Sequence, residues 1–307
     1  MTEIINYTSE KEWLDRRLKD VTSTEVSALF GMSPYASEFE LWQVKKNPQV
    51  APEFNVTERM NWGNALEEAI AKQISADMGF EVSPLKVYMR DPEIRMGSSF
   101  DFSIDSHPDH EGKGLLEIKN VDSYIFSKGW KVEGDVALEA PPHIELQCQQ
   151  QLAVSGRDYL YLGVLVGGNR SYLIKRTPIA GIIEKIRNKI TEFWISIENN
   201  VQPMIDFERD ATFINSLYQY GDKDYITYSD ESIEYLAGEY KRYSDMEKEA
   251  SKKKQGVKAE LLTLIGESGK VIGSNFTISS GTVAPKDISY TREGYRSFRI
   301  NWKRSKL

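Results

Sequence analysis

One short stretch of the chain has the residue types that phosphodiester hydrolysis requires. Asp101 is followed by the triplet Glu117-Ile118-Lys119, and both lie in apolar runs that predict β-strands. Side chains two positions apart on a strand point to the same face, so Glu117 and Lys119 should project together. Two carboxylates can hold a hard cation such as Mg²⁺, and a neighbouring lysine can orient or help deprotonate a water that attacks a phosphodiester. The alternative for the triplet alone is an ordinary strand with a Glu-Lys pair on its surface.

Further polar residues could complete such a site. Glu67 lies four residues after Gly63 on a predicted helix upstream of the strands, and it could add a carboxylate directly or through water. A glutamine can hold an attacking water or a phosphate oxygen without competing for the metal, and Gln147, Gln149 and Gln151 follow on a later helix. Gln147 and Gln151 share a helical face and Gln149 does not, so we expect at least one of the three to be a plain surface residue.

A third group of residues, near the start of the chain, is suited to binding phosphate. Arg16 and Arg17 precede Thr22-Ser23-Thr24, where a helix is predicted to begin. Free backbone N–H groups and hydroxyls at a helix N-terminus favour an anion, and an arginine can bind it bidentately. Capping of the helix explains the three hydroxyl residues equally well. We interpret the histidines as surface residues rather than ligands: His107, His110 and His143.

Composition narrows the class of protein. The 307 residues suffice for one large or two ordinary domains, and the 40% hydrophobic content suffices for a packed core. The net charge of −7 does not exclude DNA binding, because basic groups can line an internal channel of an acidic protein. A single cysteine, Cys148, excludes an internal disulfide and a cysteine-built metal site. No run of about 18 apolar residues and no signal-peptide pattern occurs, so we expect a cytoplasmic protein without a membrane segment.

The elements that must position these groups follow from hydrophobic periodicity and from helix start and stop signals. Helices are expected over residues 9–18, 22–30, 39–46 and 57–78, followed by strands over 85–90, 96–105 and 114–120. A helix is then expected after Pro141-Pro142, a strand pair over 159–166 and 171–176, and an amphipathic helix from Pro178. This order predicts an α/β fold with a mixed β-sheet flanked by helices, and it places the Glu117 triplet on the third strand.

Residues 208–307 are expected to form a C-terminal extension to a domain of residues 1–207. After a connection of low regularity, a heptad rhythm from about residue 229 predicts a long helix or a helical hairpin, and residues 270–303 return to strand and turn character. Residues 285–307 interleave aromatic and basic side chains, which suits contact with single-stranded DNA. A strand whose rings pack on the long helix is an equally good interpretation.

Seven motifs occur in one order along roughly residues 4 to 207. They are Trp13 with Arg16-Arg17, Val21-Thr22-Ser23-Thr24, Gly31-Met32-Ser33-Pro34-Tyr35, Trp62-Gly63 with Glu67, Ser99-Phe100-Asp101, Glu117-Ile118-Lys119, and Gln147-Cys148-Gln149. Together they resemble the YqaJ-like viral recombinases, which are the phage lambda exonuclease relatives within the PD-(D/E)xK nuclease superfamily. The resemblance implies a nuclease-like mixed sheet and a Mg²⁺-dependent exonuclease, with Mn²⁺ as a substitute ion. Such an enzyme degrades one strand of duplex DNA from a 5′-phosphate end and leaves a 3′ overhang for a phage single-strand annealing protein. The resemblance also suggests a homo-oligomeric ring that encloses DNA.

The resemblance assigns roles by position in the motifs. Asp101 and Glu117 would be the metal carboxylates, the Ile118 carbonyl a further ligand, and Lys119 the residue that positions the attacking water. Glu67 would support the metal site, Gln147 and Gln149 would be the family's Q-x-Q pair, and Arg17 with Thr24 would bind the terminal 5′-phosphate.

Several alternatives stay open at this point. Asp105 competes with Asp101 for the metal, because the 15 residues between Asp101 and Glu117 leave room for a hairpin turn at residues 107–109. Arg16 is close enough to Arg17 to compete for the phosphate. The same fold could also serve a structure-specific or restriction-type endonuclease, or a catalytically silent DNA-binding scaffold.

Overall fold

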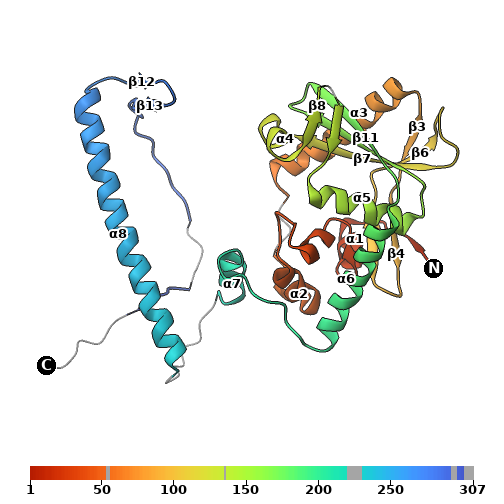
Figure 1. Cartoon of the computed structure of the whole chain (residues 1–307), viewed down its shortest axis with the longest axis horizontal. Helices are drawn as coiled ribbons and strands as arrows, with labels where there is room; N and C mark the ends of the chain where they lie inside the picture. Colours follow the sequence, from red (N-terminus) through yellow and green to blue (C-terminus); the bar gives the residue numbers. More distant parts are fainter. Residues whose placement is uncertain (53–55, 135, 220–229, 292–295, 301–307) are drawn as a thin grey trace. The chain divides into compact units, whose positions relative to one another are not determined.

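The chain folds into two compact units, Met1–Ile214 and Asn215–Leu307. The structure is a computed structural model that describes residues 1–52, 56–134, 136–219, 230–291 and 296–300 (Figure 1). The predicted division between residues 207 and 208 lies just before the boundary of the units. Residues 208–214 belong with the first unit because Asp210 is buried and the ring of Phe213 packs edge-on against Phe39, with the ring centroids 6.1 Å apart.

Two β-sheets form the frame of the first unit. The four-stranded sheet has the order β1 (Glu3–Asn6), β4 (Val87–Asp91), β5 (Met96–Ser99) and β2 (Val21–Thr22). The five-stranded sheet has the order β11 (Arg170–Arg176), β10 (Leu160–Val166), β7 (Gly114–Val121), β6 (Phe102–Ser106) and β3 (Glu81–Pro84). The β7–β10 and β2–β5 pairs are parallel and the other pairs in these sheets are antiparallel, so the predicted α/β fold with a mixed sheet is confirmed.

One predicted strand is wrong in an informative way. Residues 96–105 were expected to form a single strand, but β5 and β6 belong to different sheets and the chain bends between them at Phe100 and Asp101. The apolar pattern is continuous across the bend because both sheets bury their inner faces. The Asp101 carbonyl accepts a hydrogen bond from Leu85 N at 3.0 Å, which fixes the crossing.

The predicted turns are confirmed. β6 and β7 form an antiparallel hairpin around residues 107–109, with Phe102 opposite Leu116. The β10–β11 hairpin turns at residues 167–169, between the paired residues Val166 and Arg170, and Gly167 and Gly168 both have the positive φ that glycine adopts without steric cost.

The first unit also contains helices that pack on the sheets and on one another. They are α1 (Glu10–Arg17), α2 (Glu38–Lys46), α3 (Glu58–Met78), α4 (Ser123–Gly129), α5 (Pro142–Ser155), α6 (Ala180–Glu198) and α7 (Ala211–Leu217), with 3₁₀ turns η1 (Val26–Phe30) and η2 (Pro48–Val50). The predicted cap at Ser9 is present, since its side chain accepts from Glu12 N, and Thr57 caps α3 by accepting from Met60 N. The helix expected from residue 22 is wrong, because Val21–Thr22 pairs with β5 and η1 begins only at Val26.

The sequence patterns missed several short elements. These are β1, η2, β3, α4, α7, and the pair β8 (Lys131–Glu133) and β9 (Val136–Glu139). None exceeds seven residues, so their periodicity is too short to stand out from the surrounding loops.

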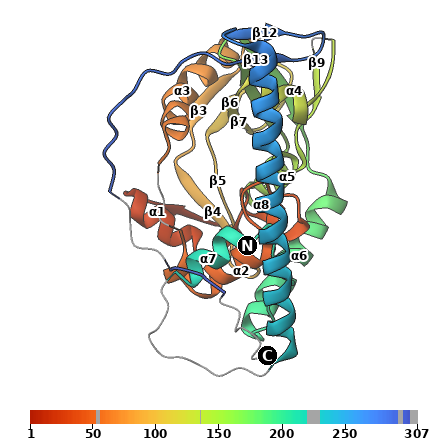
Figure 2. The same ribbon diagram turned by 90° about the vertical axis from the view of Figure 1, so that its left-hand side faces the viewer.

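The core forms two apolar layers, one on each face of β7. Leu116 and Ile118 pack with Ile70 and Ile74 of α3, whereas Leu115 belongs to the layer that α5 and α6 cover. Figures 1 and 2 show α3 and α5 on opposite sides of the strand. Because side chains alternate along a strand, the odd-numbered residues of β7 face α5.

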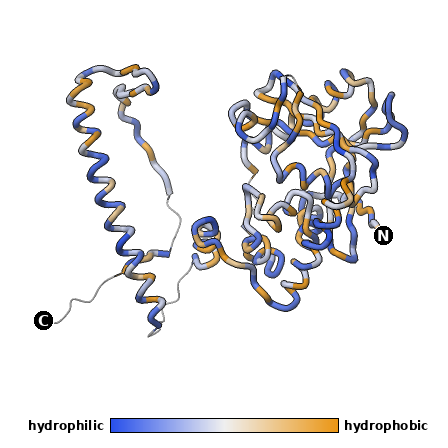
Figure 3. Tube along the Cα trace, in the orientation of Figure 1, coloured by the Kyte–Doolittle hydropathy of each residue, from blue (hydrophilic) through white to orange (hydrophobic). Residues whose placement is uncertain are grey.

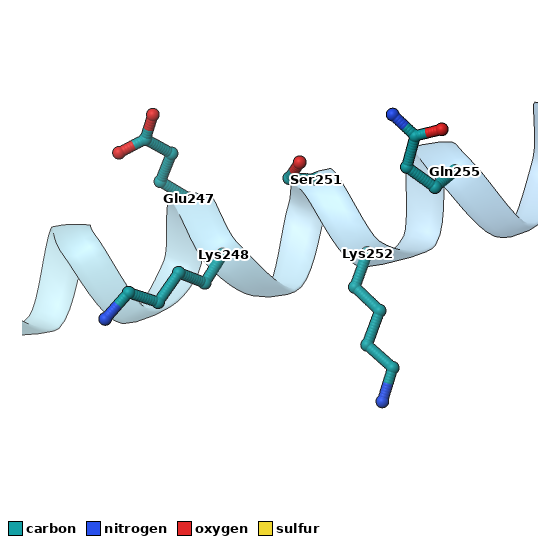
Figure 4. A pocket seen from close by; sticks show the side chains of 5 residues that line it. All are labelled: Glu247, Lys248, Ser251, Lys252 and Gln255. Atoms are coloured by element: carbon teal, nitrogen blue, oxygen red, sulfur yellow. The ribbon is translucent and has the colours of Figure 1, made fainter.

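The second unit is dominated by one 35-residue helix, α8 (Glu231–Ile265), which settles the choice between a long helix and a hairpin. Figure 3 shows hydrophobic and hydrophilic residues alternating along it, and none of its residues is buried. A shallow hollow on α8 is lined by polar side chains of this one helix (Figure 4): Glu247, Lys248, Ser251, Lys252 and Gln255.

The chain after α8 contains a small hairpin of β12 (Lys270–Ile272) and β13 (Thr277–Ser279). Phe298 lies edge-on to Tyr240 of α8 with ring centroids 5.3 Å apart, which supports a packing role for this ring. The strand predicted around Phe298 is wrong for residues 296–300, and Tyr295 and Trp302 lie outside the described residues. In the part of the chain that the structure describes, no helix has the length and apolar character needed to cross a bilayer.

Candidate functional site

Glu117 lies at the centre of a buried polar cluster beneath α5. Its side chain points toward α5 with that of Lys119, and Lys119 Nζ lies 2.6 Å from Glu117 Oε1, so the predicted shared face is confirmed. Gln147 Nε2 donates to the same oxygen at 2.6 Å, and Gln151 Nε2 donates to Oε2 at 2.7 Å. With 4% of its surface exposed, Glu117 is a buried carboxylate that is stabilised by one ammonium and two amides.

Asp101 reaches the same strand from the bend between the two sheets. The β6–β7 ladder ends at Phe102 opposite Leu116, and beyond it Asp101 Oδ2 accepts a hydrogen bond from Ile118 N at 2.8 Å. The N–H and C=O groups of one strand residue point to the same edge, so the Ile118 carbonyl also faces the side on which Asp101 lies. Asp105 is engaged elsewhere, because its carboxylate accepts from Ser83 at 2.5 Å and from Ser103 at 3.0 Å.

Burial and the charge of Glu117 raise the pKa values of two neighbouring carboxylates. Burial raises the pKa of Asp101 well above its ordinary value, and the charge of Glu117 raises it further. Burial and then Glu117 likewise raise the pKa of Glu67 on α3. Burial acts to lower the pKa of Lys119, but Glu117 and Asp101 outweigh it and raise that pKa. Three carboxylates therefore share one ammonium, and a bound cation would relieve their repulsion.

The oxygen atoms of this cluster are of the kind that binds a hard cation, although the side chains are not arranged around a common metal position. Across the described residues, no group of three His, Cys, Asp or Glu side chains is arranged to hold a metal ion. Both Glu117 oxygens instead accept from Lys119, Gln147 and Gln151. Carboxylate and carbonyl oxygens are nonetheless what Mg²⁺ prefers, and Asp101 and Glu67 lie near enough to Glu117 for its charge to raise their pKa values further after burial. The residues present therefore fit a divalent cation.

The glutamines of α5 separate into two roles. Gln149 does not share the contacts of Gln147, because its Nε2 donates to Thr177 O at 3.0 Å and its Oε1 accepts from Ile179 N at 2.8 Å. These contacts place Gln149 where β11 leads into α6. Gln151 is the residue that joins Gln147 at Glu117. The expectation that one of the three is a surface residue is wrong, because α5 is enclosed by the sheets and α6 and all three are buried.

The structure brings Arg17 and Thr24 together at a second polar site. Arg17 Nη2 donates to Thr24 Oγ1 at 3.0 Å, and its guanidinium lies 4.6 Å from the centre of the Trp13 ring. Trp13 Nε1 donates to Ser99 Oγ at 2.8 Å, two residues before Asp101, which links this site to the acidic cluster. Arg16 instead faces Glu12 at 3.9 Å.

A buried lysine that the sequence patterns missed ties this second site together. The Lys45 side chain is 0% exposed, and its Nζ lies 2.8 Å from both Arg17 O and Glu25 Oε2. Glu25 Oε2 also accepts from Thr22 N at 2.9 Å. Lys45 thereby joins the end of α1 to the turn that carries Thr24. The sequence did contain one indication of this role. Lys45 lies on the apolar face of α2, where burying a lysine without an acidic partner is energetically costly, so its position predicts such a partner.

His143 was also missed, because it was interpreted as a surface residue. It is half-buried on α5 one turn before Gln147, and Tyr35 lies edge-on to its ring with centroids 5.9 Å apart. Burial and then the charge of Lys119 lower the pKa of His143. The surface interpretation is wrong for the other two histidines as well, since both are half-buried and lie beside the Tyr161 ring: His107 and His110.

Comparison with known proteins confirms the resemblance that the motifs predict. Residues 12–158 match the family model of the YqaJ-like viral recombinase domain, and this range contains the predicted site residues from Arg17 to Gln149. The protein YqaJ of Bacillus subtilis (strain 168) is 30% identical over 189 residues, which are 61% of this chain and 56% of that protein. The chain therefore spans little more than half the length of this relative.

Two solved structures are also similar to the chain. An alkaline exonuclease (LHK-Exo) from Laribacter hongkongensis is 18% identical with a TM-score of 0.47, and the match covers 66% of this chain and 99% of that one. A phage related exonuclease from Haemophilus somnus 129PT is 12% identical with a TM-score of 0.39, and the match covers 64% of this chain and 89% of that one.

Proposed function

Since residues 12–158 match the model of the YqaJ-like viral recombinase domain, we propose that this chain is a divalent-metal-dependent deoxyribonuclease that digests linear duplex DNA from its 5′ ends. The observation that carries this proposal is the convergence of Asp101, Glu117 and Lys119 on residues 117–119 of β7, just past the end of its ladder with β6. A chain without catalysis has no physical reason to keep repelling carboxylates in one buried place, which weighs against a silent scaffold.

Asp101, Glu117 and the Ile118 carbonyl would hold the cation, with Glu67 in support. We take the cation to be Mg²⁺, with Mn²⁺ as a substitute, because every proposed ligand atom is oxygen. The cation would supply the positive charge that the attacked phosphate and the attacking water need. Gln147 and Gln151 keep Glu117 in place by donating one hydrogen bond to each of its oxygens.

Lys119 would act as a donor at the reacting phosphate. The carboxylates of Glu117 and Asp101 raise its pKa despite burial, so the side chain is an ammonium at neutral pH. An ammonium can orient the attacking water and neutralise charge on a phosphate oxygen, whereas it cannot accept a proton. We therefore assign Lys119 to positioning and charge stabilisation.

Arg17 and Thr24 would bind the terminal 5′-phosphate. A guanidinium and a hydroxyl 3.0 Å apart can both donate to one phosphate, and Lys45 holds the two segments that carry them. Arg17→Ala should slow 5′-phosphorylated ends at least about 10-fold, toward the rate of 5′-hydroxyl ends, and should hardly change the latter. Arg16→Ala is the matched control and should leave both rates near wild type. Equal slowing of both substrates by Arg17→Ala would assign Arg17 to another part of the DNA backbone.

The products and partners follow from the family as further parts of the proposal. Digestion in the 5′-to-3′ direction would leave 3′ overhangs for a phage single-strand annealing protein in recombination by strand annealing. A homo-oligomeric ring around DNA and a cytoplasmic location would suit that role.

One experiment separates the leading function from its alternatives. Linear, nicked and closed-circular duplexes are incubated with the full chain and Mg²⁺, and 5′-phosphorylated ends are compared with 5′-hydroxyl ends. We expect digestion of the linear duplex, a preference for 5′-phosphate, and no cutting of the closed circle. Cutting of the closed circle would indicate an endonuclease, and binding without any cutting would indicate a scaffold.

A further inference from the structure

A large aromatic side chain is exposed on a turn whose backbone is held firmly. Tyr35 is 81% exposed in the turn between η1 and α2. Tyr35 N and Ala36 N both donate to Ser33 Oγ, at 3.1 and 3.2 Å. Arg209 Nη2 donates to Ser33 O at 2.5 Å and to Ala36 O at 2.8 Å, so an arginine distant in sequence fixes the turn from outside.

The position of Tyr35 relative to the acidic cluster follows from two contacts. The His143 ring meets the Tyr35 ring edge-on, at 88° and with centroids 5.9 Å apart. His143 lies one turn before Gln147 on α5, and Gln147 donates to Glu117. Tyr35 therefore stands at the solvent side of the cluster in which the phosphodiester would be cut.

Exposure of this ring needs a reason other than folding. A tyrosine that is 81% exposed buries little apolar surface, so it adds little to the stability of the turn. With 81% of its surface exposed, Tyr35 has ring surface available for stacking, and the fixed turn lowers the conformational entropy that binding would cost. The chemical class that stacks on such a face beside a phosphodiester site is a nucleobase.

We propose that Tyr35 is a stacking platform for a nucleobase within the first three nucleotides of the digested strand, with His143 as the residue that positions the ring. The inference rests on the proposed nuclease function and adds a subsite to it. Stacking accepts every base, because each has a π-face, so the platform holds DNA of any sequence.

The test pairs a side-chain deletion with deletion of the base itself. Initial rates of the full chain are measured on 5′-phosphorylated duplexes that are intact or carry one abasic nucleotide at position one, two or three. Tyr35→Ala should lower kcat/KM on the intact duplex roughly 5- to 150-fold. At one abasic position, wild type and Tyr35→Ala should have equal rates, because the stacking partner is absent from both.

Two variants control for other roles of the side chain. Tyr35→Phe should retain the wild-type rate on the intact duplex, because it keeps the ring and loses only the hydroxyl. His143→Ala should lower kcat/KM less than Tyr35→Ala on the intact duplex and have no effect at the same abasic position. Thermal melting of each variant shows whether the turn remains folded.

The outcomes separate the subsite from the function on which it rests. Digestion that Tyr35→Ala leaves unchanged, or slows equally on the intact and all abasic duplexes, would overturn the subsite and leave the nuclease function standing. No digestion of any DNA by wild type would overturn both.

Discussion

Lys119 is placed so that its loss should affect turnover more than binding. It contacts Glu117 through one hydrogen-bonded ion pair, and Gln147 and Gln151 still hold that carboxylate when Lys119 is removed. We expect Lys119→Ala to lower kcat by about 100-fold or more, since the proposed role is exercised in the transition state. Single-turnover digestion and DNA affinity measured separately provide the check. Near-wild-type digestion would remove Lys119 from the mechanism.

Asp101 should reduce the stability of the metal-free protein at neutral pH. Burial and the charge of Glu117 raise the pKa of Asp101 in the folded state. The pKa of Asp101 in the unfolded state is near 3.8, so the folded protein loses stability as the pH rises above that value, whereas a neutral side chain would cause no such loss. Asp101→Asn keeps an oxygen that can accept from Ile118 N. We expect this variant to be more stable by about 1–2 kcal/mol at pH 7 in the presence of a chelator, and to be inactive.

The dependence on pH provides the control for Asp101→Asn. Below the unfolded pKa the Asp101 carboxyl is protonated in both states, so urea unfolding at about pH 3 should show almost no difference between variant and wild type. Added Mg²⁺ should stabilise wild type and leave the variant nearly unchanged. A gap in stability that is the same at every pH would show that charge is not its cause.

At the scale of elements, α5 combines a face toward the proposed catalytic site with a structural face. Gln147 contacts Glu117, whereas Gln149 joins the backbone of Thr177 and Ile179 where β11 leads into α6. We expect Gln147→Ala to lower kcat roughly 10- to 100-fold at little cost in stability. Gln149→Ala should instead lower the free energy of unfolding by about 1–3 kcal/mol, because it removes two side-chain–backbone hydrogen bonds.

Urea unfolding and initial rates of the two glutamine variants at one temperature distinguish these effects. The reversed result, with Gln149→Ala folded but slow, would return Gln149 to the site and support the Q-x-Q assignment. Gln151→Ala is informative beside them, because Gln151 donates both to Glu117 and to Ser99 O.

For the whole molecule, the second unit offers a test of how DNA is retained. Residues 285–307 carry seven Lys and Arg against two acids, and Phe298 packs on Tyr240 of α8. We expect their deletion to reduce the nucleotides removed per binding event, with a steeper loss at high salt, because basic groups that track phosphates are removed. The melting of residues 1–214 should change little, because they form a compact unit of their own. Unchanged processivity in a folded truncation would leave Phe298 with a packing role alone.

The sequence by itself determined the features that depend on neighbouring residues. Alternation along residues 114–121 fixed which side chains of β7 share a face, because successive side chains of a strand point to opposite sides. The cap at Ser9 fixed one helix start, and paired glycines fixed the β10–β11 turn. The seven ordered motifs also sufficed for the family resemblance that residues 12–158 confirm.

Tertiary structure decided the contacts between distant segments. Gln147 and Gln151 lie 30 and 34 residues from Glu117 in sequence, and only the packing of α5 on the sheet selects them over Gln149. Asp101 lies beside β7 because the chain passes at this residue from the four-stranded sheet to the five-stranded sheet. The apolar pattern of residues 96–105 is unbroken and does not reveal this crossing. A local sequence pattern shows the periodicity of one helix or strand. The partner of a buried charge depends instead on which elements pack together, as the ion pair of Lys45 with Glu25 also shows.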